Sequence, residues 1–414
     1  MTELSPLLKQ ATPMLADRGE GVYLFTDDGG DGVPRRFLDF TAGIGVVSTG
    51  HCHPRVVQAV RDQVGKLIHG QYTTVSSKPL RELIPRLGEV LPTGLDSVFF
   101  ANAGSESVEA ALRLARHATG RQNVITFHGG FHGRTMAAAS MTTSGTKVRS
   151  GFGPMMPGVA VAPFPYAHHY GWSESEAVEF AVRELDYLLA TVSAPADTAA
   201  FLIEPVLGEG GYVPTPPEFM RALRERADAH GILLIVDEIQ TGFGRTGTFW
   251  CLERADIQAD ILVLAKGIAS GFPLSAMAAS HELMAKGWAG SQGGTYGANP
   301  VACAAAMATL DVIREEKLVD NAAEMGARLR AGLEELAGSG SGIGEVRGLG
   351  LMQACEFDDP ARATAVQQRA AELGLLLLTC GAYGQVVRMI PPLVVNAEQI
   401  DEGLSLWERA LSVG

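Results

Sequence analysis

The stretch "LLIVDEIQTGFGRTG", residues 233 to 247, begins as a buried strand and ends on two carboxylates. Four apolar residues, Leu233 to Val236, precede Asp237 and Glu238, which come where the strand should meet its loop. In open α/β sheets, ligands bind outside the carboxyl ends of the parallel strands. The stretch therefore predicts that Asp237 faces a ligand, and it raises the question of which positive charge the carboxylate meets.

Similar apolar strands alternate with helical segments on both sides of this stretch. Such alternation favours an α/β fold, in which helices cover both faces of a mostly parallel sheet. The predicted strands are "SVFFA" (97–101), "NVITF" (123–127), "AAFLIEP" (199–205), "ILLIVDE" (232–238) and "DILVLA" (260–265).

The two ends of the chain have a different pattern. Residues 21–40, "GVYLFTDDGGDGVPRRFLDF", predict a hairpin with an Asp/Gly-rich turn. Beyond Pro300, an Ala-rich helix and a second helix precede "GIGEVRGLGLMQACEF", another helix, and the short strands "LLLLT" and "VVRMI". We expect a large domain at residues 50–300 and a smaller α+β domain formed by residues 1–49 and 301–414, to which the hairpin returns.

Composition limits the classes of partner. The chain has 414 residues, more than one core usually supports, and 46% of them are apolar. Its 33 basic and 46 acidic residues give a net charge of −13, which argues against nucleic acid or an anionic membrane as partner. Five scattered cysteines, no apolar segment long enough to cross a bilayer and no signal-like start predict a cytoplasmic protein.

Lys266 ends the strand that follows the one ending at Asp237. A lysine behind apolar residues is partly desolvated, which lowers the pKa of its amine and makes it nucleophilic. Taken alone, a lysine extending its amine to solvent is the better explanation.

Three further loops offer polar or aromatic groups. Small residues in "ANAGSES" (101–107) precede a helix whose free N–H groups could hold a phosphate, although Ser105 could also be a simple cap. In "FHGGFHGRT" (127–135), Phe131 could stack on a planar ring or anchor the core, and Arg134 could bind a carboxylate. Thr295 of "GGTYGANP" offers a hydroxyl before a long helix.

Two other patterns carry charge or metal-ligating groups. Arg388 lies within an apolar strand and needs an anion from the protein or from a substrate. The pair His51 and His53 of "HCHP" has no neighbouring ligand in the sequence, so we interpret it as a structural turn and predict no metal site.

A nucleophilic lysine, a phosphate site, a stacking aromatic and a buried aspartate together fit pyridoxal 5'-phosphate. The pyridinium nitrogen of this cofactor requires an acidic partner. Asp237 would meet that ring N–H⁺, which answers the question raised by the first stretch.

The chain resembles the class III (subgroup II) aminotransferases of fold type I, and within them the 4-aminobutyrate branch. The resemblance extends from about Val22 to the C-terminus. It is carried by motifs in the family's order: "NAGSESVEAALRLAR", "GGFHGRT", "IEPVLGEGG", "VDEIQTGFGRTG", "LAKGIASGFPL", "GGTYGANP" and "LLLLTCGAYGQVVRMIPPL".

The resemblance implies a cofactor site. Lys266 would bind the cofactor covalently and move a proton, Asp237 would hold the ring nitrogen, and Gln240 would bond the phenolic oxygen. The ring faces would contact Phe131 and Ile239. The phosphate would be bound by Gly104, Ser105 and, from the neighbouring subunit of a homodimer or dimer of dimers, Thr295.

The resemblance also implies a switch between two kinds of substrate. Arg134 would bind the distal carboxylate of either substrate, and Arg388 the α-carboxylate of glutamate or 2-oxoglutarate. Glu204 would neutralise Arg388 while an ω-amino acid occupies the site. The expected reaction moves the amino group of 4-aminobutyrate to 2-oxoglutarate.

Other activities on this scaffold stay open. Ile44 stands where related dialkylglycine decarboxylases have a glutamine, which favours transamination. Acetylornithine or ornithine aminotransferases, amino-acid racemases or epimerases, and a PLP-binding module without turnover are alternatives. The donor and the roles of Gln71 and Tyr72 are not determined by the sequence.

Overall fold

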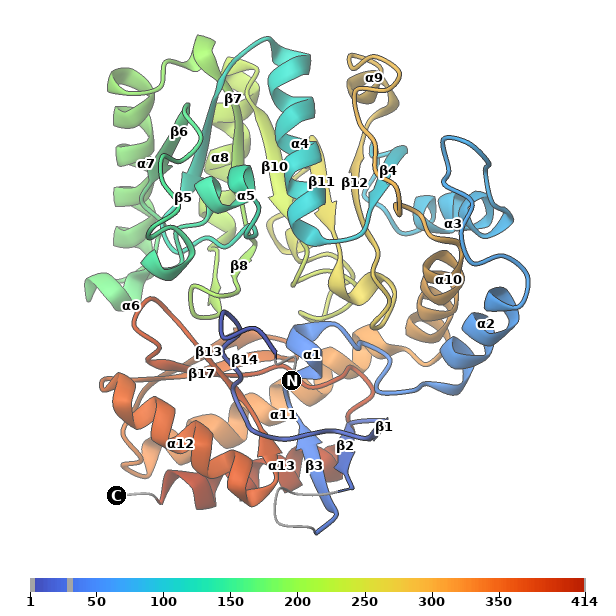
Figure 1. Cartoon of the computed structure of the whole chain (residues 1–414). Helices are drawn as coiled ribbons and strands as arrows, with labels where there is room; N and C mark the ends of the chain where they lie inside the picture. Colours follow the sequence, from blue (N-terminus) through green and yellow to red (C-terminus); the bar gives the residue numbers. More distant parts are fainter. Residues whose placement is uncertain (1–3, 28–32, 413–414) are drawn as a thin grey trace.

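A seven-stranded sheet forms the centre of the molecule (Figure 1). The structure is a computed structural model and describes residues 4–27 and 33–412. The strand order is β4-β12-β11-β10-β7-β5-β6, and β12 alone in this sheet runs antiparallel to its neighbours. The predicted α/β class with a mostly parallel sheet is confirmed. The bounds are β4 Ser97–Ala101, β12 Ser275–Ala279, β11 Ile261–Leu264, β10 Leu233–Asp237, β7 Thr198–Ile203, β5 Asn123–Phe127 and β6 Val159–Ala162.

Both faces of this sheet are covered, which explains the uninterrupted apolar runs. Alternate residues of β10 enter different clusters: Leu234 and Val236 join the one that includes α8 (Pro217–His230) and α7 (Glu174–Thr191). Ile235 joins the cluster on the side of α4 (Gly104–Thr119). Because residues 234–237 of the strand are all buried, the carboxyl groups at its end are conspicuous.

The sequence did not predict two strands of the sheet, β12 and β6. Their sequences, "SAMAA" and "VAVA", are short and rich in alanine, a residue with little preference for strands. Pairing with β11 and β4 on either side, rather than intrinsic propensity, defines β12.

Two smaller sheets lie below the large one in Figure 1, with orders β13-β14-β17-β16 and β1-β2-β3-β15. The predicted hairpin is β2–β3, and β3 pairs with β15 from the C-terminal part, so the hairpin does return to that part. Its turn, residues 28–32, lies outside the described residues. The predicted strand "LLLLT" divides between both sheets as β15 and β16. The domain boundaries at residues 50 and 300 stay predictions. The bounds are β1 Arg18–Glu20, β2 Tyr23–Thr26, β3 Arg35–Asp39, β13 Ile343–Leu349, β14 Met352–Phe357, β15 Leu375–Leu376, β16 Leu378–Cys380 and β17 Val386–Met389.

Helices complete the fold. Helix α10 (Pro300–Glu315) packs on α2 (Pro54–Val64) and α3 (Lys78–Gly88). Among the described residues, the structure contains no helix with the length and apolar character needed to span a membrane. The other elements are α1 Ala42–Gly45, α5 Met136–Met141, α6 Ala167–Tyr170, α9 His281–Met284, α11 Leu318–Gly338, α12 Pro360–Leu373, α13 Ala397–Leu411, β8 Val206–Leu207, β9 Val213–Pro214, η1 Thr146–Val148, η2 Pro195–Asp197, η3 Cys251–Ala255 and η4 Lys266–Ile268.

Candidate active site

A pocket of about 300 Å³ lies at the carboxyl ends of the parallel strands. Eight of the residues predicted for the site line it: Gly104, Ser105, Phe131, Glu204, Asp237, Ile239, Gln240 and Lys266. They come from segments far apart in the chain, and the sheet brings them together. The lining also includes Val46, Asn102, Ala103, His132, Gly133, Ala265, Gly271, Phe272, Pro273 and Leu274.

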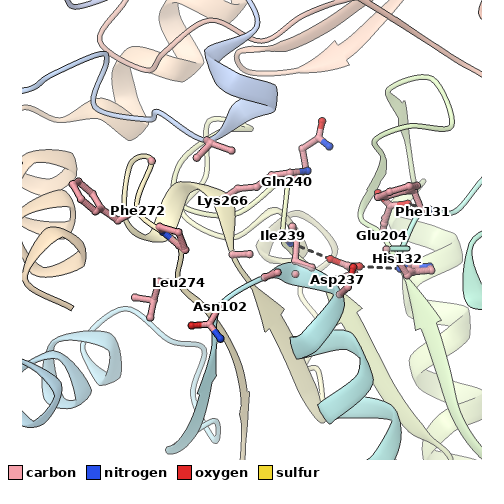
Figure 2. Close-up of a pocket in the computed structure, with 18 residues that line it drawn as sticks. Asn102, Phe131, His132, Glu204, Asp237, Ile239, Gln240, Lys266, Phe272 and Leu274 are labelled. Carbon is pink, nitrogen blue, oxygen red and sulfur yellow. Dashed lines mark hydrogen bonds and ion pairs between the residues drawn. The ribbon is translucent and has the colours of Figure 1, made fainter. Parts of the chain in front are cut away.

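Asp237 is held by two hydrogen-bond donors at the end of β10 (Figure 2). Its Oδ1 accepts from the backbone N–H of Ile239 at 3.1 Å, and its Oδ2 lies 2.8 Å from Nδ1 of His132. The Asp237 side chain is 3% exposed. Because both oxygens are engaged in a buried site, the carboxylate has one fixed orientation toward the pocket.

Lys266 follows β11 with an unusual backbone conformation. Its φ is +45°, in the left-handed region that disfavours a residue with a Cβ. Residues kept in that region cluster at functional sites, where the surrounding structure compensates the cost. Burial lowers the pKa of the Lys266 amine, and the Arg388 guanidinium lowers it further, against the opposing effects of Glu209 and Asp237. The amine is therefore a better nucleophile than a solvated lysine.

The N-terminus of α4 enters the same pocket. Its N-cap residue, Ala103, makes no side-chain hydrogen bond, so a bound anion could accept from the N–H groups of the first turn. Close packing surrounds this turn: a Cβ on Gly104 would lie 2.8 Å from Cδ1 of Ile239, and one on Gly133 would lie 2.2 Å from Oγ of Ser105. The glycines thus allow the Ile239 and Ser105 side chains to pack closely against this turn.

Gln240 presents a buried side-chain oxygen that has no hydrogen-bond partner. A buried polar atom without a partner is costly, and a bound ligand can remove that cost. Gln240 follows Ile239 on the loop after β10, so this loop supplies two lining residues of the pocket.

Glu204 is fixed by backbone groups. It accepts hydrogen bonds from N–H of Phe131 at 2.7 Å and from N–H of Gly208 at 2.9 Å. Burial raises the pKa of Glu204 to about 7, the nearby Asp237 adds to this, and His132 and the two N–H groups oppose it.

The predicted pairing of Glu204 with Arg388 is wrong. Arg388 makes its ion pair with Glu209, which lies five residues beyond Glu204 in the same "IEPVLGEGG" segment. Glu204 cannot fill that place because its oxygens bind the backbone next to Phe131. Burial raises the pKa of Glu209, but Arg388, Lys266 and Arg134 together bring it below its ordinary value. Glu209 is therefore ionised in the pair.

Arg134 and Ile44 stand outside the pocket lining. The Arg134 side chain is exposed, with Cζ 5.8 Å from the ring centre of Phe131, and its backbone N–H donates to Oγ of Ser105 at 3.2 Å. Ile44 is 41% exposed and has a φ of +68°. Their roles in binding substrate stay predictions.

Thr295 is exposed and lines a different pocket of the same chain. A hydroxyl at this position does not reach the phosphate site of its own chain. The predicted contribution across a subunit interface is not tested by a single chain.

Gln71 and Tyr72, which the sequence left without a role, bond to their own chain. Oε1 of Gln71 accepts from N–H of Thr74 at 3.0 Å, and the Tyr72 hydroxyl donates to the carbonyl of Phe100 at 3.3 Å. Neither residue lines the pocket of this chain.

The histidines of "HCHP" have protein partners. Nε2 of His51 lies 2.8 Å from Asp39, and His53 caps α2 while its Nε2 lies 3.0 Å from Glu316. These contacts agree with the interpretation of the segment as a structural turn.

Sequence reasoning missed two residues, His132 and Glu209. Both lie inside quoted motifs, "GGFHGRT" and "IEPVLGEGG". The histidine next to Phe131 was a visible signal, but its bond to a residue 105 positions away was not. For the glutamates, the sequence offers two candidates and no means to choose between them.

Comparison with known proteins gives consistent results. The sequence model described as aminotransferase class-III matches residues 7–411. A 5-aminovalerate aminotransferase of Pseudomonas putida is 40% identical, covering 97% of this chain and 94% of that protein. A 4-aminobutyrate aminotransferase of Escherichia coli is also 40% identical, covering 96% and 93%. A solved (S)-enantioselective omega-transaminase from Thermomicrobium roseum superposes with a TM-score of 0.91 at 32% identity, covering 99% of this chain and 96% of that one.

Proposed function

The chain belongs to the class III aminotransferases, and from this premise we propose that it transfers the amino group of 4-aminobutyrate to 2-oxoglutarate. The products are succinate semialdehyde and glutamate, formed in two successive half-reactions. The observation that carries the proposal is the ion pair of Arg388 with Glu209, whose charges both act on Lys266. Relatives that act on 4-aminobutyrate and 5-aminovalerate support the class of donor.

The cofactor of this aminotransferase is pyridoxal 5'-phosphate, and the residues of the pocket fit it. The side-chain oxygen of Gln240 has no partner, and the first turn of α4 has no side-chain cap, so its N–H groups are available to a phosphate. When bound, the cofactor supplies an aldehyde that takes up the amino group and a ring that stabilises negative charge on the substrate carbon.

We assign the surrounding residues as follows. Asp237, held by His132, accepts the hydrogen bond of the ring nitrogen and keeps that nitrogen protonated. The side-chain N–H of Gln240 donates to the phenolic oxygen. Phe131 and Ile239 contact the ring, and the first turn of α4 at Gly104 and Ser105 binds the phosphate. Lys266 holds the cofactor and, when released, carries the proton that leaves the substrate carbon.

Charge balance explains how one pocket accepts two kinds of substrate. In this proposal Arg134 binds the distal carboxylate of both. While an ω-amino acid is bound, Glu209 neutralises Arg388, and the α-carboxylate of glutamate or 2-oxoglutarate later displaces Glu209. Arg388, the buried cation of the pair, therefore has a carboxylate partner in either state.

The active site is complete in a homodimer in this proposal, alone or within a dimer of dimers, because Thr295 of the partner subunit reaches the phosphate. Thr295 is exposed and does not line the pocket of its own chain, which supports this arrangement. A cytoplasmic location stays a prediction, with support from five cysteines that form no disulfide.

Single half-reactions test the donor. The cofactor-loaded enzyme is mixed separately with 4-aminobutyrate, 5-aminovalerate, ornithine, N-acetylornithine and glutamate, without a keto acid, and the visible absorbance of the cofactor is followed. Rapid change with 4-aminobutyrate and glutamate, and slow change with both ornithines, is the expected result. A faster response to 5-aminovalerate or to an ornithine would move the assignment to that donor.

A further inference from the structure

Two arginines share one row of the sheet β13-β14-β17-β16. Arg347 of β13 pairs with Ala354 of β14, and Ala354 pairs with Arg388 of β17. Residues opposite each other on antiparallel strands project to the same face, so both arginines project from one face of the sheet, about 10 Å apart at the backbone. The alanine between them leaves space for a loop.

The loop at this face carries Glu209. It connects β8 to β9 and contains three glycines, Gly208, Gly210 and Gly211. The side chain of Glu209 pairs with Arg388, while Nε of Arg347 donates to the carbonyl of Gly211 at 2.8 Å. The two arginines of the row therefore contact the same loop two residues apart.

Fixed contacts matter in this loop because glycine gives the backbone wide freedom. The φ of Gly211 is +122°, and a Cβ there would lie 3.0 Å from Nη2 of Arg347. A further inter-segment anchor is N–H of Gly381, which donates to the carbonyl of Glu209 at 2.9 Å. Losing Arg347 would leave the loop with fewer restraints on the position of the Glu209 carboxylate.

Arg347 is itself rigidly held. It is 5% exposed, forms ion pairs with Glu345 and Glu356, and lies with Cζ 5.2 Å from the ring centre of Tyr166. The Tyr166 hydroxyl donates to Glu356. A buried guanidinium with two carboxylates has a defined place and keeps its charge.

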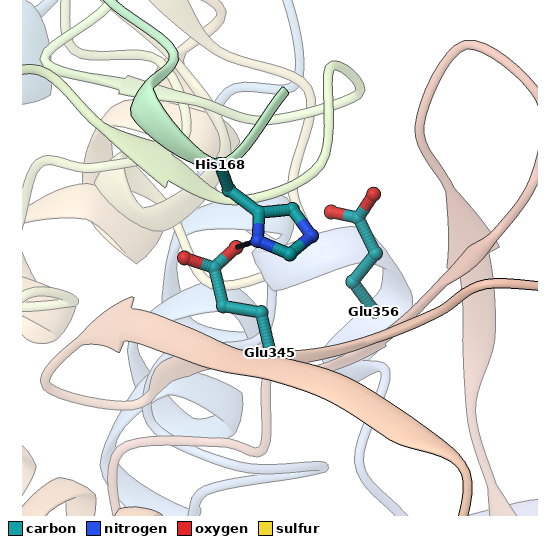
Figure 3. A group of neighbouring side chains, drawn as sticks. All are labelled: His168, Glu345 and Glu356. Atoms are coloured by element: carbon teal, nitrogen blue, oxygen red, sulfur yellow. Dashed lines mark ion pairs between the residues drawn. The ribbon is translucent and has the colours of Figure 1, made fainter. Parts of the chain in front are cut away.

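The same carboxylates could suggest a metal site. Figure 3 shows His168 beside Glu345 and Glu356, whose ligand atoms lie within 4.8 Å of one another. However, Nη1 of Arg347 already pairs with both glutamates, and a divalent ion would have to displace it. The cluster is better explained as the support of Arg347.

We propose that Arg347 is a positioning residue for Glu209. Through Glu209 it helps to determine how the site distinguishes ω-amino acids, which lack an α-carboxylate, from glutamate and 2-oxoglutarate, which have one. The inference rests on the proposed function, since it concerns the same pair of Arg388 and Glu209. With the loop held, Glu209 meets Arg388 whenever no α-carboxylate is bound. With the loop released, Arg388 is left free to bind the carboxylate of an ω-amino acid in the wrong place.

The test compares Arg347→Met with Glu209→Gln as reference and Arg330→Met as matched control. Arg330 donates to the carbonyl of Gly348, next to Arg347, but makes its ion pair with Glu334 rather than with the loop. We expect Arg347→Met to slow the half-reaction with 4-aminobutyrate at least about tenfold, the loss expected for one charge-assisted hydrogen bond. The half-reaction with glutamate should change less than about threefold, and Arg330→Met should change neither.

Binding gives a readout independent of turnover. Glutarate, a dicarboxylate without an amine, must displace Glu209, so calorimetry should show it binding to Arg347→Met as tightly as to the parent or more tightly. If Arg347→Met folds poorly, Arg347→Lys keeps the buried charge but lacks the planar fork that bonds Gly211, and the same selectivity is expected.

The outcomes separate the two ideas. Selective loss in both Glu209→Gln and Arg347→Met supports the inference. The inference is overturned if Arg347→Met slows both half-reactions equally while Glu209→Gln slows mainly the one with 4-aminobutyrate. Arg347 is then a structural residue. Equal loss in Glu209→Gln rejects the switch itself, and the inference fails with it.

Discussion

Asp237 and Glu238 are neighbours in the chain, yet they lie on opposite sides of the strand end. Asp237 lines the pocket and is held by His132 and the Ile239 backbone. Glu238 is fully buried away from the pocket, where it accepts from the Thr241 hydroxyl and from N–H of Leu252 at 2.8 Å. Identical charge and adjacent position therefore give a ligand group in one case and a structural acceptor in the other.

A second comparison concerns Glu204 and Glu209. Backbone N–H groups hold Glu204, and such donors cannot leave without moving the chain. A guanidinium from another sheet holds Glu209, and a competing carboxylate can take its place. The end of the large sheet thus holds Glu204 in a fixed place. The contact between the Glu209 loop and the smaller sheet instead holds a carboxylate that a substrate carboxylate can replace.

The largest effect is expected at Lys266, whose amine is influenced by the charges of Glu209, Arg388 and Asp237. Lys266→Ala should slow turnover by about 10⁴-fold, the upper end of what positioned proton transfer contributes. Single-turnover absorbance of the cofactor-loaded variant with glutamate measures this. A variant that still turns over at a rate near the parent would remove Lys266 from the mechanism.

The second largest effect is expected for Asp237→Asn. It should lower the rate of both half-reactions by about 10²-fold, as does removal of one group that stabilises a transition state electrostatically. Both half-reactions should suffer alike because the ring nitrogen serves each of them. His132→Phe should cause a smaller loss in the same direction. Selective loss in one half-reaction would place Asp237 on the substrate instead of the ring.

Glu238→Gln should leave both half-reactions unchanged, since the residue does not reach the pocket. Its effect is on stability: burial raises the pKa of Glu238 to about 7, against hydrogen bonds from Thr241 and the backbone that lower it. With a folded-state pKa above the unfolded value of 4.5, the ionised form disfavours folding, so the parent loses stability as pH rises from about 4.5 to about 7.

An amide avoids that loss, because its oxygen accepts from Leu252 and its nitrogen can donate to the Thr241 hydroxyl. The free energy of unfolding of the parent and of Glu238→Gln is measured by urea denaturation at pH 5 and pH 8. The variant should be more stable relative to the parent at pH 8 than at pH 5. A gain at pH 5 instead would contradict the buried position of the charge.

Much of the fold followed from local patterns. The strands ending at Asp237 and Lys266 were predicted because they are continuous apolar runs, and the sheet did bury both faces of them. By contrast, β12 has an ordinary alanine-rich sequence, and its place comes from partners distant in the chain. "LLLLT" shows the same limit: one apolar run serves two sheets because its partners differ.

The sequence by itself predicted eight of the residues that line the pocket, because strand ends mark the edge of the sheet where ligands bind. It could not determine which carboxylate meets which cation. That choice depends on side-chain direction and on backbone donors brought from distant segments, such as Phe131 beside Glu204 and the row of Arg347 and Arg388 across the smaller sheet. Pairing of buried charges is decided by distances of a few ångströms, and only the tertiary structure sets those distances.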